Sequence, residues 1–199
     1  MEIFNLYRNL KILNKIEVIF ATISALAVVL SFVRFPFGDE LLILSVGLFS
    51  LFYIAIGVFI YKFDKSDAAG TKFSKVVLSF YACNGYGVCL LGILFKLLIW
   101  PGEKEMMLVA FATCLINIFL ILVFWLIFRN NYLKNHLITS FFFFIVTTFF
   151  YLIPIYTIID IRYWNQNDCG LIIKQSYDDP RNERLRNQAS ECKYNRKNK

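Results

Sequence analysis

Residues 106–128 read MMLVAFATCLINIFLILVFWLIF, a stretch of 23 residues without a single charged side chain. As an α-helix this stretch is about 35 Å long, because a helix rises about 1.5 Å per residue. The hydrocarbon core of a bilayer is about 30 Å thick, so one such helix is long enough to cross it. The stretch therefore predicts a membrane-spanning helix.

Four other apolar stretches have a comparable length, at residues 16–33, 41–61, 76–99 and 137–159. Each is a continuous apolar run, whereas the strands of a membrane barrel alternate apolar and polar residues over about ten positions. The sequence therefore predicts an all-α fold, a multi-pass transmembrane helix bundle of about five spans.

The composition of the 199-residue chain supports the same class, with 58% hydrophobic and 18% charged residues. Soluble domains average about 45–50% apolar and about 25% charged residues, so the chain lies outside that class. The high apolar content, with 22 Phe, excludes a disordered chain, and five Cys are too few for a disulfide scaffold. An integral membrane protein is the class that remains.

Charged connections between the apolar runs divide the chain into seven segments. Short polar turns follow the first and third runs, so each pair of flanking helices is expected to form an antiparallel hairpin. Pro154 lies near the far end of the fifth run, and a re-entrant segment there would place the tail in the cytoplasm. The predicted segments are a cytoplasmic or interfacial N-terminus (1–15), hairpin 1 (16–61), a cytoplasmic loop (62–75), hairpin 2 (76–128), a second cytoplasmic loop (129–136), a fifth transmembrane helix (137–159) and a polar basic tail (160–199).

Lys and Arg are distributed unequally between the two sides of this arrangement. The N-terminus and the loops 62–75 and 129–136 carry nine of them, against five close to the membrane on the opposite side. Cytoplasmic loops carry the excess of Lys and Arg in membrane proteins. We therefore expect a cytoplasmic N-terminus and, with five spans, a C-terminus on the outer side.

The tail from residue 160 onward is polar and basic. We expect it to be disordered or loosely ordered, with Asp160 and Arg162 exposed to solvent. Cys169 and Cys192 both lie in the tail; they can form a disulfide if the tail is exported and stay reduced if it is cytoplasmic. The other cysteines lie inside apolar runs and are expected to be small packing residues. They are Cys83, Cys89 and Cys114.

A stretch of small residues inside the third run contains Asn84, Gly85 and Gly87. Small residues let membrane helices approach closely, and an asparagine can form a hydrogen bond across the contact. These three residues and Asn117 are therefore candidates for helix packing. The alternative is that the two asparagines line a path for a substrate.

Ionisable residues are rare within the runs and lie near their ends. We expect Glu17 and His136 at the membrane–water interface, and the side chain of Lys96 to extend outward to it. The sequence contains no CxxC, HExxH or comparable cluster. We therefore predict no catalytic residue, no metal site and no cofactor.

Two turns that lie 65 residues apart share a sequence pattern: residues 35–42 read FPFGDELL, and residues 100–107 read WPGEKEMM. In each turn an aromatic residue precedes a proline, and a glutamate follows in the first turn of the next run, where the helix dipole favours negative charge. The pattern favours an ancestral duplication of a two-helix unit; the alternative is two hairpins that solve one turn problem alike. The motif residues are Phe35, Pro36, Glu40, Trp100, Pro101 and Glu105.

The strings FPFGDELL and LLIWPGEKEMMLV (residues 97–109) resemble the transmembrane hairpin of the GldL family. This family supplies the membrane subunit of the gliding-motility and type IX secretion motor of Bacteroidetes, and small membrane proteins of that phylum carry similar turns. The resemblance implies a hairpin in a bacterial inner membrane, with its turn facing the periplasm. The family conducts protons through a glutamate in the second helix, about ten residues beyond the turn glutamate. Ser50 and Leu115 stand at those positions here, so the resemblance does not carry the proton role over.

The absence of a catalytic or metal-binding motif favours a non-catalytic assembly component, one that associates with itself or with other membrane proteins in the lipid bilayer. A small transporter or channel subunit is the alternative. A membrane enzyme would need a convergent polar cluster at one interface, for which Asp39, Glu40, Lys104 and Glu105 are the candidates. We attribute the net charge of +7 to anionic lipid headgroups and expect no nucleic-acid partner.

Overall fold

The computed structural model describes residues 2–33, 35, 37–59, 69–128, 131–164, 167–179 and 181–197. These residues form eight helices and no strand, which confirms the predicted all-α class. The helices are α1 (Glu2–Phe32), α2 (Gly38–Phe59), α3 (Ala69–Leu97), α4 (Glu103–Phe128), α5 (Asn131–Leu152), α6 (Ile155–Arg162), α7 (Asn167–Asp178) and α8 (Glu183–Lys197).

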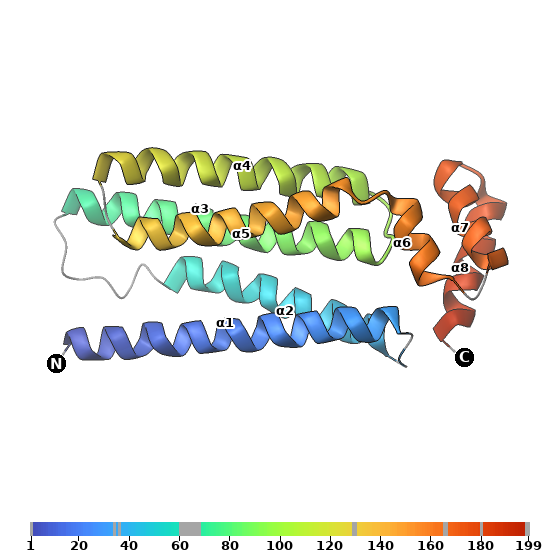
Figure 1. The fold of residues 1–199 in the computed structure, drawn as a ribbon, viewed down its shortest axis with the longest axis horizontal. Helices are drawn as coiled ribbons and strands as arrows, with labels where there is room; N and C mark the ends of the chain where they lie inside the picture. Colours follow the sequence, from blue (N-terminus) through green and yellow to red (C-terminus); the bar gives the residue numbers. More distant parts are fainter. Residues whose placement is uncertain are drawn as a thin grey trace.

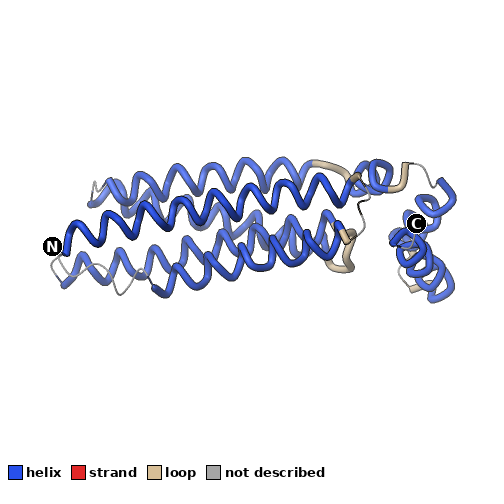
Figure 2. The backbone as a smooth tube through the Cα atoms, turned by 90° about the horizontal axis from the view of Figure 1, so that it is seen from below, coloured by secondary structure: helices blue, strands red, loops and turns tan. Residues whose placement is uncertain are grey.

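Helices α1 to α5 lie side by side along the long axis of the molecule (Figure 1). The short helix α6 lies at one end of this bundle, and α7 and α8 lie beyond it; the chain therefore starts at one end of the molecule and finishes at the other. Figure 2 shows the same arrangement from below, with short described loops joining the helices at the end that carries α6. We call α6, α7 and α8 together the end cap.

Within the part of the chain that the structure describes, four helices are long and apolar enough to cross a membrane. A fifth crossing exists if α5 and α6 are counted as one broken span. The apolar segments of the four helices are Lys15–Phe32, Gly38–Ala55, Val77–Leu97 and Glu103–Ile127. Their number agrees with the prediction of about five spans.

The fifth apolar run is bent, where we predicted one continuous helix over residues 137–159. The bend between α5 and α6 is 80°. Pro154 lies at the break in an extended conformation (φ −60°, ψ 140°) and has no backbone N–H to continue the helical hydrogen-bond pattern. The prediction of a straight span was therefore wrong beyond Leu152, and Pro154 is the physical cause.

The N-terminal segment is not a separate interfacial helix, because α1 continues without a break from Glu2 to Phe32. The predicted loop 62–75 is shorter than expected: α3 already begins at Ala69, and residues 60–68 lie outside the described residues. The second loop is short as well, since α5 begins at Asn131 and residues 129–130 lie outside the described part.

The C-terminal tail is folded into α7 and α8, so the prediction of a disordered or loosely ordered tail was wrong. Ile173 of α7 and Ala189 of α8 are buried in a cluster that includes Ile99 from the α3–α4 turn. The side chain of Asn182 accepts a hydrogen bond from the backbone N–H of Leu185 and so caps the start of α8. Apolar residues supplied by α6 and by a distant turn thus allow a polar segment to fold.

Helix α3 is the centre of the bundle. It packs against α2, α4 and α5, and 61% of its span residues are buried, against 17% for the span of α1, which packs on α2. Aromatic rings fill the space around α3: the ring of Tyr86 stacks on Phe143 at 4.7 Å and meets the edge of Tyr53 at 5.3 Å. The interior is therefore a packed core of the kind found in other helical bundles.

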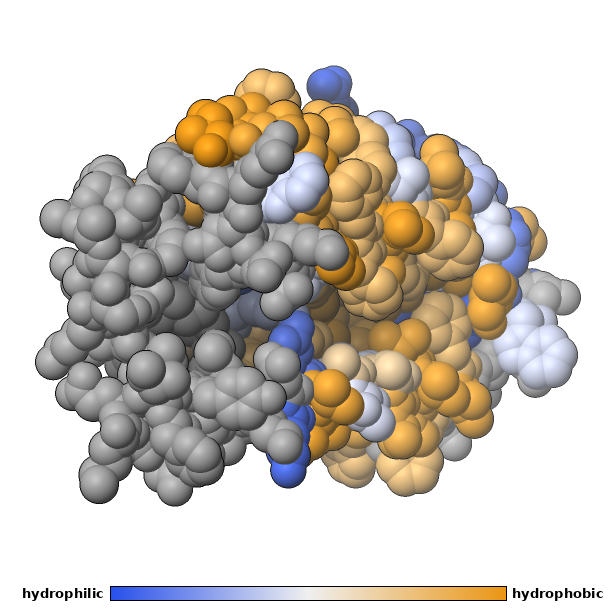
Figure 3. Space-filling model, turned by 60° about the vertical axis from the view of Figure 1, so that its left-hand side comes forward, coloured by the Kyte–Doolittle hydropathy of each residue, from blue (hydrophilic) through white to orange (hydrophobic). Residues whose placement is uncertain are grey.

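The outer surface of the bundle is largely apolar, and large hydrophobic side chains cover much of the coloured part of the face seen in Figure 3. Lipid solvates such a surface, whereas a patch of this extent in water marks a site of association or aggregation. Exposed residues of this kind occur on every long helix and include Ile19, Leu26 and Val29 in α1, Leu44 and Leu51 in α2, Tyr81 in α3, Ile116 and Phe119 in α4, and Phe142 and Ile145 in α5.

The two turns predicted to be related have matching backbones. The N–H of Phe35 donates to the carbonyl of Leu30, and at an offset of 65 residues the N–H of Trp100 donates to Phe95, both at 3.0 Å. The backbone angle φ matches at the same offset: it is positive at Phe37 (+64°) and at the equivalent residue Gly102 (+81°). The shared conformation is what a duplicated unit would show, and it is also what one geometric solution used twice would show.

Gly102→Ala is expected to reduce the free energy of unfolding by about 1–2 kcal/mol, because an L side chain in the left-handed region places Cβ against a carbonyl oxygen. Space is not the limit, since the nearest atom to the new Cβ is Glu105 Oε2 at 3.9 Å. Unfolding in mixed detergent micelles measures the change. Gly47→Ala in α2 is the matched control: its Cβ would meet nothing within 4 Å, and alanine favours a helix. Equal stability of the two variants would contradict the prediction.

Candidate functional site

A buried arginine is one of the contacts that attach the end cap to the bundle. Arg162, at the end of α6, is only 2% exposed. Its Nη2 lies 2.5 Å from Oδ2 of Asp39 in the first turn of α2, and its Nη1 donates a hydrogen bond to the carbonyl of Leu97 at the end of α3. The hydroxyl of Ser31 in α1 donates to Oδ1 of the same aspartate at 2.6 Å. One guanidinium group thus links α6 to the first two hairpins.

Helix dipoles favour the charges at this end of the bundle. Asp39 lies at the N-terminal end of helix α2, where negative charge is favourable. Arg162 meets a carbonyl at the C-terminal end of helix α3, where positive charge is favourable. Lys96 follows the same rule: it is buried, and its Nζ donates to the carbonyl of Tyr151 beside the Pro154 break, at 3.3 Å. Our expectations of an outward Lys96 and a solvated Arg162 were therefore wrong.

A tyrosine of the end cap forms a second contact, with the turn between α3 and α4. The hydroxyl of Tyr177 in α7 donates to the buried carboxylate of Glu103 in the first turn of α4. The Nζ of Lys104 lies 4.9 Å from the centre of the Tyr177 ring, a cation–π contact. Burial raises the pKa of Tyr177, and its hydrogen bond to Glu103 and the negative charge there raise it further. The phenol therefore stays protonated and keeps donating at neutral pH.

The six predicted turn residues frame this site without supplying its main contacts. Phe35, Glu40, Pro101 and Glu105 are exposed, whereas Trp100 is half-buried with its ring edge-on to Phe95 at 5.0 Å. Pro36 lies outside the described residues. The contacts come instead from the acidic neighbours Asp39 and Glu103 and from Arg162 and Tyr177 of the end cap.

The sequence contained one signal for this arrangement. Arg162 follows a fifth apolar run directly, and acidic residues open both helices that begin after a turn. A positive residue after the fifth run and negative residues at the two helix starts indicate that these charges can pair at one end of the bundle. Which acidic residue Arg162 meets depends on the bend at Pro154.

The four packing candidates behave differently from one another. Gly85 faces Asn117 of α4 so closely that a Cβ at this position would lie 1.7 Å from its Nδ2 atom. Gly87 faces α2, where the hydroxyl of Ser50 donates to the glycine carbonyl at 3.1 Å. Asn84 donates to the carbonyl of Phe80 in its own helix, so this hydrogen bond does not cross a helix contact. Two glycines on one helix thus admit two different neighbours.

A second polar group lies among the aromatic rings around α3. The hydroxyl of Tyr53 donates to the carboxylate of Glu17, which joins α2 to α1. The hydroxyl of Tyr86 lies 2.8 Å from Oγ of Ser140 and donates to the carbonyl of His136 at 3.1 Å. Glu17 and His136, which we expected at the interface, are half-buried in these contacts.

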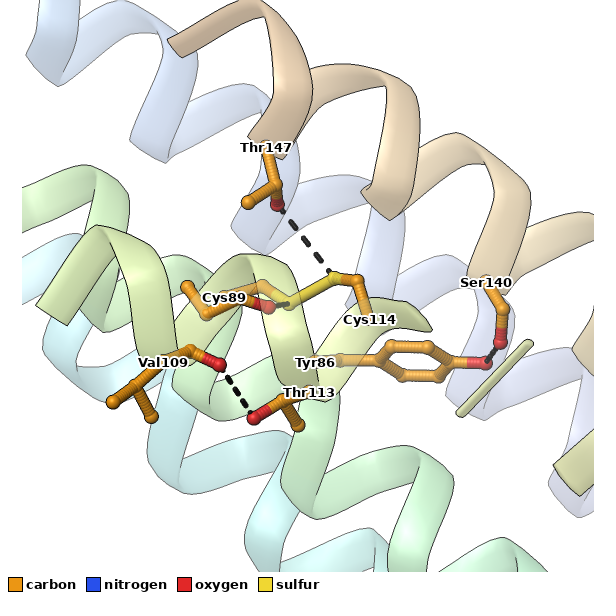
Figure 4. Close-up of a disulfide and its surroundings, with 8 residues drawn as sticks. Tyr86, Cys89, Val109, Thr113, Cys114, Ser140 and Thr147 are labelled. Atoms are coloured by element: carbon orange, nitrogen blue, oxygen red, sulfur yellow. Dashed lines mark hydrogen bonds between the residues drawn. A yellow bond between two sulfur atoms is a disulfide. The ribbon is translucent and has the colours of Figure 1, made fainter. Parts of the chain in front are cut away.

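Four of the five cysteines are paired. Cys169 and Cys192, the pair suggested by the sequence, form a disulfide between α7 and α8, with their Cα atoms 5.6 Å apart. Cys89 of α3 and Cys114 of α4 form a second disulfide (Figure 4), although we predicted them to be separate packing residues. Figure 4 also shows Thr147 of α5 directed at this pair; its hydroxyl lies 3.7 Å from the Cys114 sulfur. Their positions on different apolar runs gave no indication that they meet.

Among the described residues, no group of three or more His, Cys, Asp or Glu side chains is arranged to hold a metal ion. Comparison with protein-family models, curated proteins and solved structures found no match. The resemblance to the GldL family therefore stays a prediction from the turn motifs. At the two positions where that family's glutamate would align, Ser50 is buried against α3 and Leu115 is exposed on α4.

Arg162→Met is expected to loosen the end cap, because it removes the guanidinium group that neutralises Asp39 and donates to the Leu97 carbonyl. Loss of one partner of a buried pair costs about 3–5 kcal/mol. Hydrogen exchange of α7 in detergent measures the effect, and Arg181→Met, at an exposed position, is the matched control. Replacing both Asp39 and Arg162 by Met should restore part of the protection. Unchanged exchange of α7 in Arg162→Met would show that the arginine does not hold the cap.

Gly85→Ala is expected to destabilise the bundle, because the new methyl group occupies the place of the Asn117 amide. Asn117→Ala in the same chain should relieve this clash, so the effects of the two substitutions will not add. Unfolding in mixed micelles of both single variants and the double variant gives the coupling. Additive effects would mean that Gly85 and Asn117 do not meet.

Proposed function

We propose that the chain is a non-catalytic assembly component of a bacterial inner membrane, with the bundle in the bilayer and the end cap on the outer side. The observation that carries this proposal is the attachment of the end cap. Arg162 and Tyr177 bind acidic residues of both hairpin turns, so charged groups at this end contribute to structure within the chain. The result is a fixed platform at the end of the bundle, to which another membrane protein or a second copy can bind.

Two independent features support the proposed orientation. The excess of Lys and Arg at the N-terminus and in the loops 62–75 and 129–136 favours a cytoplasmic location for that end. The disulfide between Cys169 and Cys192 favours an oxidising compartment for the end cap, because cytoplasmic thiols are kept reduced. The resemblance of the turn motifs supports the bacterial inner membrane.

Labelling of intact cells with a membrane-impermeant maleimide tests the orientation. We expect Cys169 and Cys192 to react only after treatment with an impermeant reductant, since the disulfide blocks both thiols. A variant with both residues changed to Ala is the control for labelling within the bundle. Labelling that requires permeabilised cells would place the end cap in the cytoplasm.

Native mass spectrometry of the protein released from detergent tests the assembly role. We expect a homo-oligomer, or a stable complex with another membrane protein that cross-linking in cells also recovers. A chain that is monomeric in this measurement and yields no cross-linked partner would count against the proposal.

A small transporter or channel subunit is the second candidate, and one observation favours it. Nδ2 of Asn117 is buried and finds no hydrogen-bond partner among the described residues; such a group calls for an explanation, and binding a solute would supply one. Replacing Asn84 and Asn117 by Leu should then abolish a flux measured in liposomes. The absence of any flux through the unmodified protein would exclude this candidate.

A further inference from the structure

Helix α6 runs across the end of the bundle. The carbonyl of Tyr151, just before the bend, accepts from Lys96 of α3, and Arg162 at the other end of α6 pairs with Asp39 of α2. Between these two anchors α6 has eight residues, a length of about 12 Å. Because α6 is turned by 80° from α5, it lies close to the plane of the membrane if α5 crosses the bilayer.

The face of α6 that looks toward the bundle is well packed. Ile155, Ile158 and Ile159 are buried together with Ile99 of the α3–α4 turn. The opposite side carries Ile161, which is exposed, and large apolar residues also flank the helix. Leu152 before it is 71% exposed, and Trp164 after it is 69% exposed.

The turn between α1 and α2 adds two exposed aromatic rings at the same end of the molecule. Phe35 is exposed, and Phe37 is 78% exposed. The pairing of Arg162 with Asp39, two residues beyond Phe37, brings this turn next to the end of α6. We call Phe35, Phe37, Leu152, Ile161 and Trp164 the end belt.

We propose that the end belt lies in the boundary between lipid headgroups and acyl chains, so that phospholipid is the partner that covers it and the end cap rests on the membrane surface. Aromatic residues prefer this depth, where an apolar ring and a polar edge are both solvated. The belt continues the apolar outer surface of α1 and α5: Val33, which follows α1 directly, and Leu152, the last residue of α5, are both exposed.

Polar contacts mark the side of the end cap that faces water. Asp160, next to Ile161 in the chain, is exposed and pairs with Lys174 of α7 at 2.5 Å. On the same side, the hydroxyl of Tyr156 donates to Asp178. Charged pairs toward α7 and bare apolar side chains away from it are the distribution expected of an element that lies in an interface.

Fluorescence depth measurement tests this inference, which rests on the membrane placement proposed above but not on the assembly role. The substitutions Trp100→Phe and Trp125→Phe leave Trp164 as the single tryptophan. The protein is placed in nanodiscs whose phospholipid is brominated either near the headgroup end or near the methyl end of the acyl chains. We expect the headgroup-end bromines to quench most of the Trp164 emission and the methyl-end bromines to quench much less.

Two reference variants, each with Trp164→Phe as well, make the result decisive. Ile116→Trp, at an exposed position in the middle of α4, should show the opposite preference, and Asn187→Trp, exposed on α8, should be quenched by neither lipid. If Trp164 behaves like the Asn187→Trp reference while Ile116→Trp is quenched, the end belt does not bind lipid and only this inference fails. If Ile116→Trp is not quenched either, the membrane placement fails with it.

Discussion

The buried guanidinium group of Arg162 links α6 to both hairpins of the bundle. It is almost completely buried, so it must be neutralised by Asp39 and satisfied by the carbonyl of Leu97. These two partners belong to different hairpins, and the arginine itself belongs to a third element. This side chain therefore helps to fix the position of α6, while the hydrogen bond from Tyr177 to Glu103 and the buried cluster around Ile99 hold α7 and α8.

The bundle below this site is arranged by a different constraint, the close approach of backbones. Gly85 and Gly87 let α3 approach α4 on one side and α2 on the other. The ring of Tyr86, which lies between them in the sequence, stacks on Phe143 of α5. Lipid offers no hydrophobic driving force between helices, so such close contacts and the hydrogen bonds across them hold the helices together. Polar contacts thus position the end cap, and small residues in the middle of α3 hold the helices of the bundle together.

The sequence predicted the class of fold because lipid imposes a length and an apolar composition that are visible in single runs such as 106–128. It also predicted that the two turns are alike, and their backbones match at an offset of 65 residues. It did not predict that Arg162 is buried or that the tail is helical, since both depend on the direction in which Pro154 sends the chain. A single proline indicates a break but not its angle. The contact of Cys89 with Cys114 was missed for a similar reason: their separation of 25 residues says nothing about the rotation of α3 against α4.

The order of the contacts along the chain has a consequence for biogenesis. Asp39 and Glu103 are synthesised well before Arg162 and Tyr177, and they lie in turns that must emerge on the same face of the bilayer as the C-terminal segment. A hairpin inserted upside down would leave its carboxylate on the wrong face, out of reach of its late partner. The end cap, which is synthesised after both hairpins, can therefore complete its folding only when both have been inserted in the correct orientation.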